Sequence, residues 1–225
     1  NEFVYSAKDL ASPVFACGET HDTPRLANRK GNEVLSKMLT VFNLFIPNTI
    51  PFLNSGQEVF ERQPMNTGLD SSPEDLLALP ENDPLYKKLA LFDRYAFHYL
   101  HPQRWEMIEI LEEANKIRKG ILTDIINLKK AYYVGFGAPW DTAAGVAFES
   151  KDKLTLIIAN TDCFNDKQHQ IRCSTLPDRF LAENIQAKQI FSSEMIKQDP
   201  VTMDFANNLW VQFKKGEVKV FEITL

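Results

Sequence analysis

A histidine and an aspartate stand side by side at positions 21 and 22. They lie in the segment 18–25, which follows a short apolar run at 13–17 that predicts a strand. An imidazole beside a carboxylate can move protons or hold the polar groups of a ligand. In a βα barrel the chemistry lies on the loops that follow the strands, so a His-Asp pair at this place indicates a functional loop. Without further context, such a pair is more often solvent-facing or capping, and both interpretations are open at this point.

The segments around the pair alternate as strand, helix and strand. Apolar residues recur at helical spacing over 34–45 with one wide apolar face, and Pro47 ends the predicted helix. Ile50–Asn54 then predicts a short buried strand closed by Ser55-Gly56. The connection of about thirty residues is long enough for a right-handed parallel crossover, so we expect a βαβ unit.

The rest of the chain changes pattern twice. Residues 60–84 are rich in proline and predict a loop, and helical spacing then returns at about 84–100 and at 102–119. From about residue 131 apolar residues alternate every second position, which predicts an antiparallel β domain. Its expected strands are 132–136, 145–149, 154–159, 168–172, 187–191, 209–213 and 218–224. We therefore expect two domains, residues 1–125 and 126–225.

Composition excludes several classes of protein. The 225 residues are 44% hydrophobic, enough for a globular core, and 25 basic against 30 acidic side chains give a net charge of −5. With no basic cluster to follow phosphates, a nucleic-acid partner is not expected. No apolar run approaches the ~20 residues that span a bilayer, and the start lacks a signal peptide, so no membrane partner is expected and the location is left open, with the cytoplasm favoured.

Cysteine usage points to free thiols. The three cysteines are too few for a disulfide framework and have no zinc-ligand spacing. Buried free thiols are the default expectation, with a pairing of Cys163 and Cys173 across a hairpin as the alternative.

Two segments resemble motifs of the alpha-amylase family of glycoside hydrolases (glycoside hydrolase family 13). Residues 15–25, with Glu-Thr-His-Asp-Thr-Pro-Arg, resemble the motif at the end of the seventh barrel strand. Residues 48–58 resemble the eighth-strand motif, with proline, glycine and glutamate at the matching spacing. A helix at 108–119 and a β domain follow in the family's order. The phrase Asn-Ser-Gly-Gln-Glu, followed by Arg-Gln-Pro-Met-Asn at 62–66, resembles the maltosyltransferase-like branch.

The resemblance implies a fold class and a parent activity. The fold would be α/β followed by all-β: the C-terminal fragment of a (β/α)8 TIM barrel, about strands seven and eight with their helices, and then an antiparallel β-sandwich-like domain. The parent would act on α-1,4-glucans or maltooligosaccharides by retaining hydrolysis or glycosyl transfer. No cofactor is implied, and calcium, common in the family, is not expected from this chain.

The resemblance also assigns roles to particular residues. Asp22 matches the family's third carboxylate, which stabilises the transition state by binding sugar hydroxyls, and His21 matches the histidine that binds the same sugar. Thr20 stands where many members have asparagine. Further candidate substrate-binding residues are Arg25, Asn54, Gln57 and Glu58. For Arg25 pairing with a neighbouring carboxylate is the alternative, and Glu58 would alternatively cap the segment after it.

The bond-cleaving residues of the family are absent from these 225 residues. Its nucleophile lies in a Gly-x-Arg-x-Asp pattern after the fourth strand and its acid/base glutamate follows the fifth, and neither motif occurs here. A complete barrel needs about eight βα units, and residues 1–120 hold about two. We therefore expect a fragment that is inactive alone.

Other interpretations stay open. A non-catalytic amylase-like scaffold or interaction protein would also lack the cleaving carboxylates, and a sugar-binding module would bind maltooligosaccharides by itself. The incomplete barrel has uncovered apolar faces, which the 60–84 loop, the β domain or a second copy of the chain would have to cover, so self-association is expected. The aromatic residues Trp105, Trp140, Trp210 and Phe136 are expected to pack in the core rather than to stack on sugar rings.

Overall fold

The computed structural model describes residues 2–63, 79–84, 86–88, 105–138, 141–181 and 185–225. Most of the expected helix at 84–100, most of the expected loop at 60–84, Pro102 and Trp140 lie outside these ranges. No helix within the described residues is long and apolar enough to cross a membrane.

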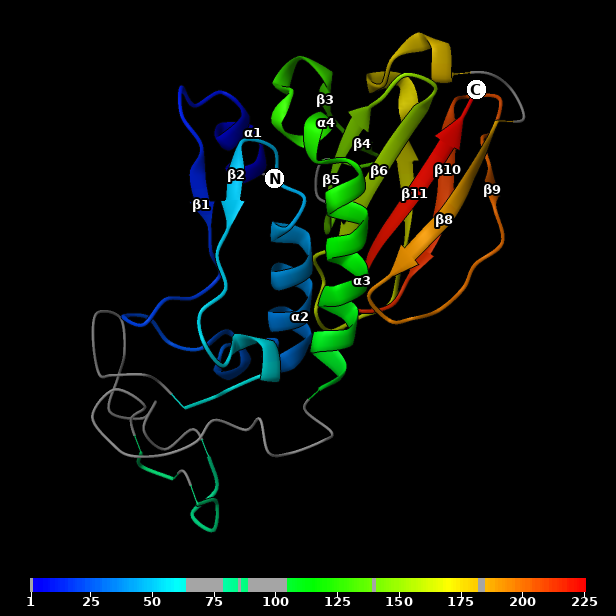
Figure 1. The fold of residues 1–225 in the computed structure, drawn as a ribbon. Helices are drawn as coiled ribbons and strands as arrows, with labels where there is room; N and C mark the ends of the chain where they lie inside the picture. Colours follow the sequence, from blue (N-terminus) through cyan, green and yellow to red (C-terminus); the bar gives the residue numbers. More distant parts are fainter. Residues whose placement is uncertain (1, 64–78, 85, 89–104, 139–140, 182–184) are drawn as a thin grey trace.

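The first part of the chain contains the predicted βαβ unit (Figure 1). Strand β1 (Val14–Ala16) is followed by helix α2 (Asn32–Asn43) and strand β2 (Thr49–Pro51), and the two strands pair in parallel. Both strands are three residues long, shorter than the apolar runs suggested. Helix α1 (Glu2–Lys8) precedes them and was not expected from the sequence.

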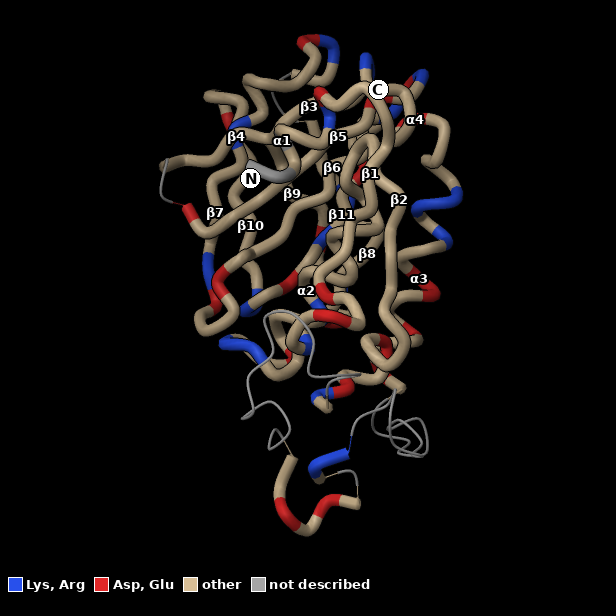
Figure 2. The backbone as a smooth tube through the Cα atoms, turned by 90° about the vertical axis from the view of Figure 1, so that its left-hand side faces the viewer, with Lys and Arg blue, Asp and Glu red and all other residues tan. Residues whose placement is uncertain are grey.

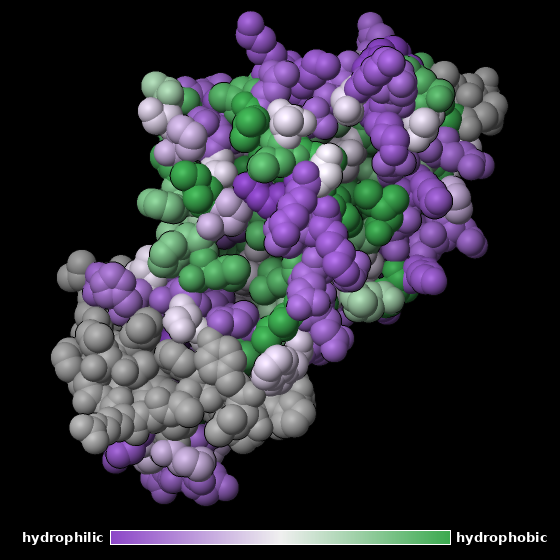
Figure 3. Space-filling view, in the orientation of Figure 1, coloured by the Kyte–Doolittle hydropathy of each residue, from purple (hydrophilic) through white to green (hydrophobic). Residues whose placement is uncertain are grey.

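Two further helices lead into the β domain. Helix α3 (Glu106–Gly120) ends at the expected glycine, and α4 (Leu122–Ile126) follows it directly. Acidic residues lie in the first turn of α3 and basic residues in its last turn, the distribution that a helix dipole favours. Figure 2 shows this separation along α3, with both signs mixed over the rest of the backbone. Figure 3 shows the outward face of α3 as a hydrophilic band.

All strand pairs of the second part are antiparallel, as expected, and they form two sheets. A six-stranded sheet has the order β3-β5-β6-β11-β8-β9, and a three-stranded sheet has the order β10-β7-β4. The expected strands are present with ends shifted by one or two residues, except that the first is divided into β3 and β4, and β9 is additional. The bounds are β3 (Ala131–Tyr133), β4 (Gly135–Phe136), β5 (Ala143–Glu149), β6 (Lys153–Asn160), β7 (Lys167–Arg172), β8 (Gln186–Ser192), β9 (Val201–Thr202), β10 (Asn208–Phe213) and β11 (Val218–Thr224).

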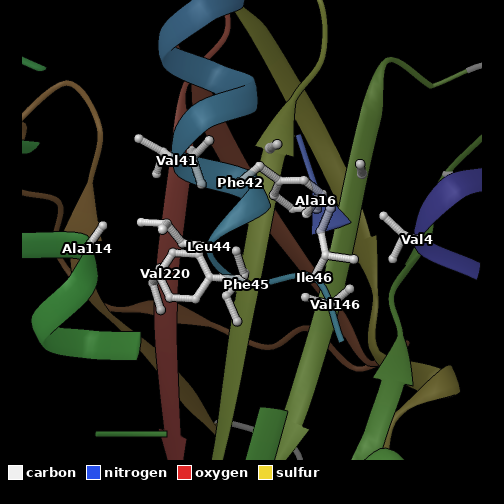
Figure 4. Close-up of a cluster of buried hydrophobic side chains, with 14 of the residues drawn as sticks. Val4, Ala16, Val41, Phe42, Leu44, Phe45, Ile46, Ala114, Val146 and Val220 are labelled. Carbon is white, nitrogen blue, oxygen red and sulfur yellow. The ribbon is translucent and has the colours of Figure 1, made fainter. Parts of the chain in front are cut away.

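The elements stack in three layers. Helices α2 and α3 lie on one face of the six-stranded sheet, and the three-stranded sheet lies on the other, at the side of the molecule opposite α3 (Figures 1 and 2). One buried cluster joins the helices to the six-stranded sheet, including Phe45, Ala114 and Val220 (Figure 4). A second cluster, including Ile158, Val211 and Phe221, fills the sandwich between the sheets. The six-stranded sheet is therefore covered on both faces.

An ionic contact ties the same layers together. The Lys37 ammonium on α2 lies 2.7 Å from a carboxylate oxygen of Glu194, after β8, and 3.5 Å from one of Glu106 at the start of α3. Because the Lys37 side chain is only 11% exposed, this cation depends on its partners for solvation.

The fold class is confirmed: a partial parallel βα barrel precedes an antiparallel β sandwich. The apolar faces of the helices are covered by the β domain, one of the three covers considered. On the two parallel strands, Phe15 and Ile50 remain 64% and 50% exposed, so the expectation of a buried strand at Ile50–Asn54 is wrong: no described element covers this face of the small sheet. The domain boundary at 125/126 and self-association stay predictions.

The alternative pairing of Cys163 with Cys173 is wrong. All three cysteines are free. Cys163 and Cys173 are buried as expected, whereas Cys17 is exposed, so the expectation of a buried thiol is wrong at that position. Burial raises the pKa of Cys173 to about 12, so this thiol stays protonated and packs as a small apolar side chain.

Gly216 sits where the β10–β11 turn meets α2. Its φ is +62°, and a Cβ there would lie 2.4 Å from Val34 Cγ1 and 3.2 Å from the Val34 carbonyl oxygen. We expect Gly216→Ala to lower the free energy of unfolding by about 1–3 kcal/mol, because left-handed backbone strain adds to a clash between layers. The measurement is the urea unfolding midpoint. The matched control is Gly120→Ala, where a Cβ meets nothing within 4 Å. Equal midpoints for the two variants would contradict this interpretation of the turn.

Candidate functional site

The loops that follow β1 and β2 meet at one edge of the small sheet. The strands are parallel, with Ala16 opposite Pro51, so their carboxyl ends lie together. The backbone N–H of Phe52 donates to the Ala16 carbonyl oxygen at 3.0 Å and extends the pairing beyond the last bridge. The predicted functional loop and the eighth-strand-like segment are therefore neighbours.

His21 and Asp22 form the exposed tip of the first loop. His21 Nε2 lies 3.2 Å from Asp22 Oδ2, and the two side chains are 61% and 45% exposed. The turn is held by two threonines: Asp22 N donates to Thr20 Oγ1 at 3.2 Å, and Thr20 N donates to Thr23 Oγ1 at 2.9 Å. These local bonds fix the backbone while leaving the side chains of His21 and Asp22 exposed to solvent.

A buried ion pair lies at the base of this loop. Arg25 Nη1 donates to Glu19 Oε1 at 2.8 Å, and both side chains are 1% exposed. The second carboxylate oxygen of Glu19 accepts the Leu26 N–H at 2.5 Å. Arg25 also donates to the carbonyl oxygens of Ser55 at 2.8 Å and Gln63 at 2.9 Å, both beyond β2. One guanidinium thus fastens the two loops together.

Asn54 and Gln57 continue the same buried network. Asn54 Nδ2 donates to Glu19 Oε1 at 3.3 Å, and Gln57 Oε1 accepts the Asn54 N–H at 3.2 Å. Gln57 Nε2 donates to Thr40 Oγ1 on α2 at 2.7 Å. Both amides are buried and connect the second loop to the helix behind it.

Glu58 lies toward α3. It is half-buried in a short 3-10 turn, Gln57–Val59, and lines a hollow of about 330 Å³ with Trp105, Ile108 and neighbouring residues of α3. Trp105 is 46% exposed, so the expectation that it packs in the core is wrong. Trp105 immediately precedes α3 and borders this open hollow, which leaves part of its indole accessible to solvent.

The six predicted site residues therefore occupy three places. His21 and Asp22 are at the exposed tip, Arg25, Asn54 and Gln57 are in the buried network, and Glu58 lines the hollow beside α3. Their assignment as sugar-binding residues stays a prediction. For Arg25 the structure shows the alternative, a neighbouring carboxylate, as its partner. That carboxylate, Glu19, was missed as a site residue. The sequence signal that could have identified Glu19 is its spacing: it lies three positions after the end of β1 and six positions before Arg25.

Metal ligands do not gather in the described ranges. Among those residues, no three His, Cys, Asp or Glu side chains lie close enough to hold a metal ion.

Comparison with known proteins gives a result by fold alone. No family model matches the sequence, and no curated protein sequence matches it. Solved structures do match. An alpha-amylase from Geobacillus thermoleovorans complexed with acarbose has a TM-score of 0.60 at 16% identity, covering 100% of this chain and 42% of that one. AmyP in complex with maltose has a TM-score of 0.60 at 11% identity, covering 96% and 41%.

A third match extends beyond proteins called amylases. Gamma-CGTase from alkalophilic Bacillus clarkii has a TM-score of 0.58 at 12% identity, covering 100% of this chain and 28% of that one. At these identities the comparison shows a shared fold: this chain is similar in structure to part of alpha-amylases and of a CGTase. This chain spans about two fifths of the length of the first matched structures.

Proposed function

We propose that this chain is the C-terminal part of an alpha-amylase-type enzyme that acts on α-1,4-glucans or maltooligosaccharides by retaining hydrolysis or glycosyl transfer. The observation that carries the proposal is the presentation of His21 and Asp22 on the loop after a parallel strand, in a fold shared with amylase structures that hold acarbose and maltose.

Asp22 and His21 act by binding sugar hydroxyls beside the bond that is cleaved. A carboxylate accepts hydrogen bonds from hydroxyls, and these strengthen as the ring flattens and gains positive charge. Interactions that are stronger in the transition state than in the bound substrate raise the rate. The exposed His-Asp contact at 3.2 Å leaves carboxylate and imidazole edges available for this purpose.

The buried network positions the pair. The ion pair between Glu19 and Arg25 fixes the position of the loop at the strand ends. Asn54 donates to Glu19 and Gln57 donates to a threonine on α2, so these amides connect the loop to that helix. Arg25, Asn54 and Gln57 thus serve substrate binding by holding the loop rather than by touching the sugar. Glu58 lies at the rim of the site on the α3 side.

The carboxylates that break and form the glycosidic bond come from outside these residues. A retaining site needs a nucleophile and an acid/base about 5–5.5 Å apart. Neither motif occurs in the 225 residues, so the chain alone is expected to have no turnover.

The test uses the full-length protein encoded by the gene, assayed on maltoheptaose. We expect Asp22→Asn to lower kcat/KM by about 10²–10³-fold, because a charged acceptor at the transition state is lost. Asp152→Asn, an exposed turn position in the β domain, is the matched control and should leave kcat/KM unchanged.

Two results would contradict the proposal. An unchanged rate for Asp22→Asn would remove the role of this carboxylate. A full-length sequence without Gly-x-Arg-x-Asp and a later barrel glutamate, and without activity on glucans, would support the non-catalytic scaffold instead.

A further inference from the structure

The outer face of the three-stranded sheet has an unusual composition. In the β10–β7 register, Trp210 is opposite Gln170, Asn208 is opposite Arg172 and Gln212 is opposite Gln168. Side chains directly opposite each other in an antiparallel pair project to the same face. The alternate positions, including Leu209, Val211 and Ile171, are buried in the sandwich. One indole, three glutamine amides and a guanidinium therefore share the face that points away from the core, while Asn208 is buried and donates to Asp204.

Trp210 is held in a fixed orientation on this face. It is 48% exposed, and its Nε1 donates to Asp204 Oδ2 at 3.1 Å. Hydrogen bonds from the Asn208 backbone, Trp210 and neighbouring groups lower the pKa of Asp204, so the acceptor stays ionised. The expectation that Trp210 packs in the core is wrong, because β10 turns this position outward. A half-exposed indole that is already oriented loses little freedom when a ligand stacks on it.

The edge of the sheet near the indole contains two glycines, Gly135 in β4 and Gly137 just after it. Gly135 of β4 is opposite Arg172, and Gly137 donates its N–H to the Gln170 carbonyl oxygen at 3.0 Å. A Cβ on Gly137 would lie 2.4 Å from Gln170 Oε1, so the missing side chain makes room for that amide. Arg172 donates to the Gly137 carbonyl oxygen and is thereby held against the edge. Gly135 and Gly137 therefore add no side chain to the edge beside Gln170 and Trp210.

The types of side chain on this surface indicate which class of ligand it binds. A protein interface would have a larger apolar centre, and a phosphate chain would need several cations. Here a single aromatic ring is surrounded by neutral amides, which donate and accept hydrogen bonds. The C–H face of a sugar ring covers an indole, while its hydroxyls reach the amides beside it.

We propose that the outer face of the β10-β7-β4 sheet is a surface binding site for a glucan chain, centred on Trp210 and flanked by Gln170 and Gln212. A half-exposed ring with amides opposite it and two positions along the same strand suits several units of an extended polysaccharide rather than a single sugar. It lies on the β domain, apart from the His21-Asp22 loop, and would hold the enzyme on its polymer. That the glucan is α-linked rests on the proposed function.

The test is binding of the 225-residue chain to starch granules and to cellulose, by co-sedimentation, with no need for turnover. We expect binding to starch, about tenfold weaker for Trp210→Ala, partly retained by Trp210→Tyr and weakened by Gln170→Ala. The matched control is Phe164→Ala, an aromatic residue 59% exposed elsewhere on the β domain. Circular dichroism confirms that each variant is folded.

The possible results distinguish failure of the surface-site inference from failure of the proposed function. Starch binding that survives Trp210→Ala, or no binding to either polymer, overturns the inference and leaves the activity of the full-length protein to be judged separately. Trp210-dependent binding to cellulose alone overturns the α-glucan assignment and counts against the proposed function. Loss of activity in Asp22→Asn with unchanged starch binding separates the two sites.

Discussion

Replacement of Arg25 by methionine is expected to lower the free energy of unfolding by about 3–5 kcal/mol. Methionine matches the arginine side chain only as far as Nε, so the substitution removes the guanidinium and leaves the Glu19 side chain, 1% exposed, without its cation. Removing one partner of a buried ion pair is costly because the remaining charge has lost both water and its counter-ion. Urea unfolding followed by circular dichroism measures the effect.

Two companion variants show whether the charge is the cause. The double variant Arg25→Met, Glu19→Met removes both charges and should recover part of the loss. Lys116→Met breaks the exposed pair with Glu113, and its midpoint should not change measurably. If Arg25→Met alone left the midpoint where it is, Arg25 would not be the fastening between the two loops.

The second large effect is expected at Phe45, in the cluster that joins α2 and α3 to the six-stranded sheet (Figure 4). Phe45 is 0% exposed, so Phe45→Ala leaves a cavity and should cost about 3–5 kcal/mol. Because helices and strands share this cluster, the helical signal and the tertiary signal should shift to lower urea together.

The control for this variant is Phe205→Ala. Phe205 is 91% exposed, so its truncation should change the free energy of unfolding by no more than about 0.5 kcal/mol. If the helical and tertiary signals of Phe45→Ala separated into two transitions, the helices and the β domain would unfold independently, and the shared cluster would not be one cooperative core.

Elements with a strong local period were predictable. The helix at 34–45 and most β strands were placed to within a few residues, because one-sided burial imposes a spacing of 3.6 or two on the sequence. Strand β9, two residues long, and helix α4, five residues long, carry too few positions to show a period.

The alternating sequence pattern did not predict that some strands would be buried on both faces. Strands β5 and β6 are buried at nearly every position, since α2 and α3 cover the face that an isolated sandwich would leave to solvent. Trp210 shows the converse: it was assigned to the core as a large apolar residue in a strand. The buried positions of β10 include Leu209 and Val211, so the alternation of the strand places Trp210 on the outer face.

At the candidate site the sequence by itself determined the adjacency of His21 and Asp22 and their place after a strand, because these are properties of neighbouring residues. The sequence also offered a neighbouring carboxylate for Arg25. Only the tertiary structure decided its further acceptors, since Ser55 and Gln63 are 30 and 38 residues away and reach it through the parallel pairing of β1 with β2. A buried guanidinium binds whichever acceptors the fold brings to it, and local sequence does not encode that choice.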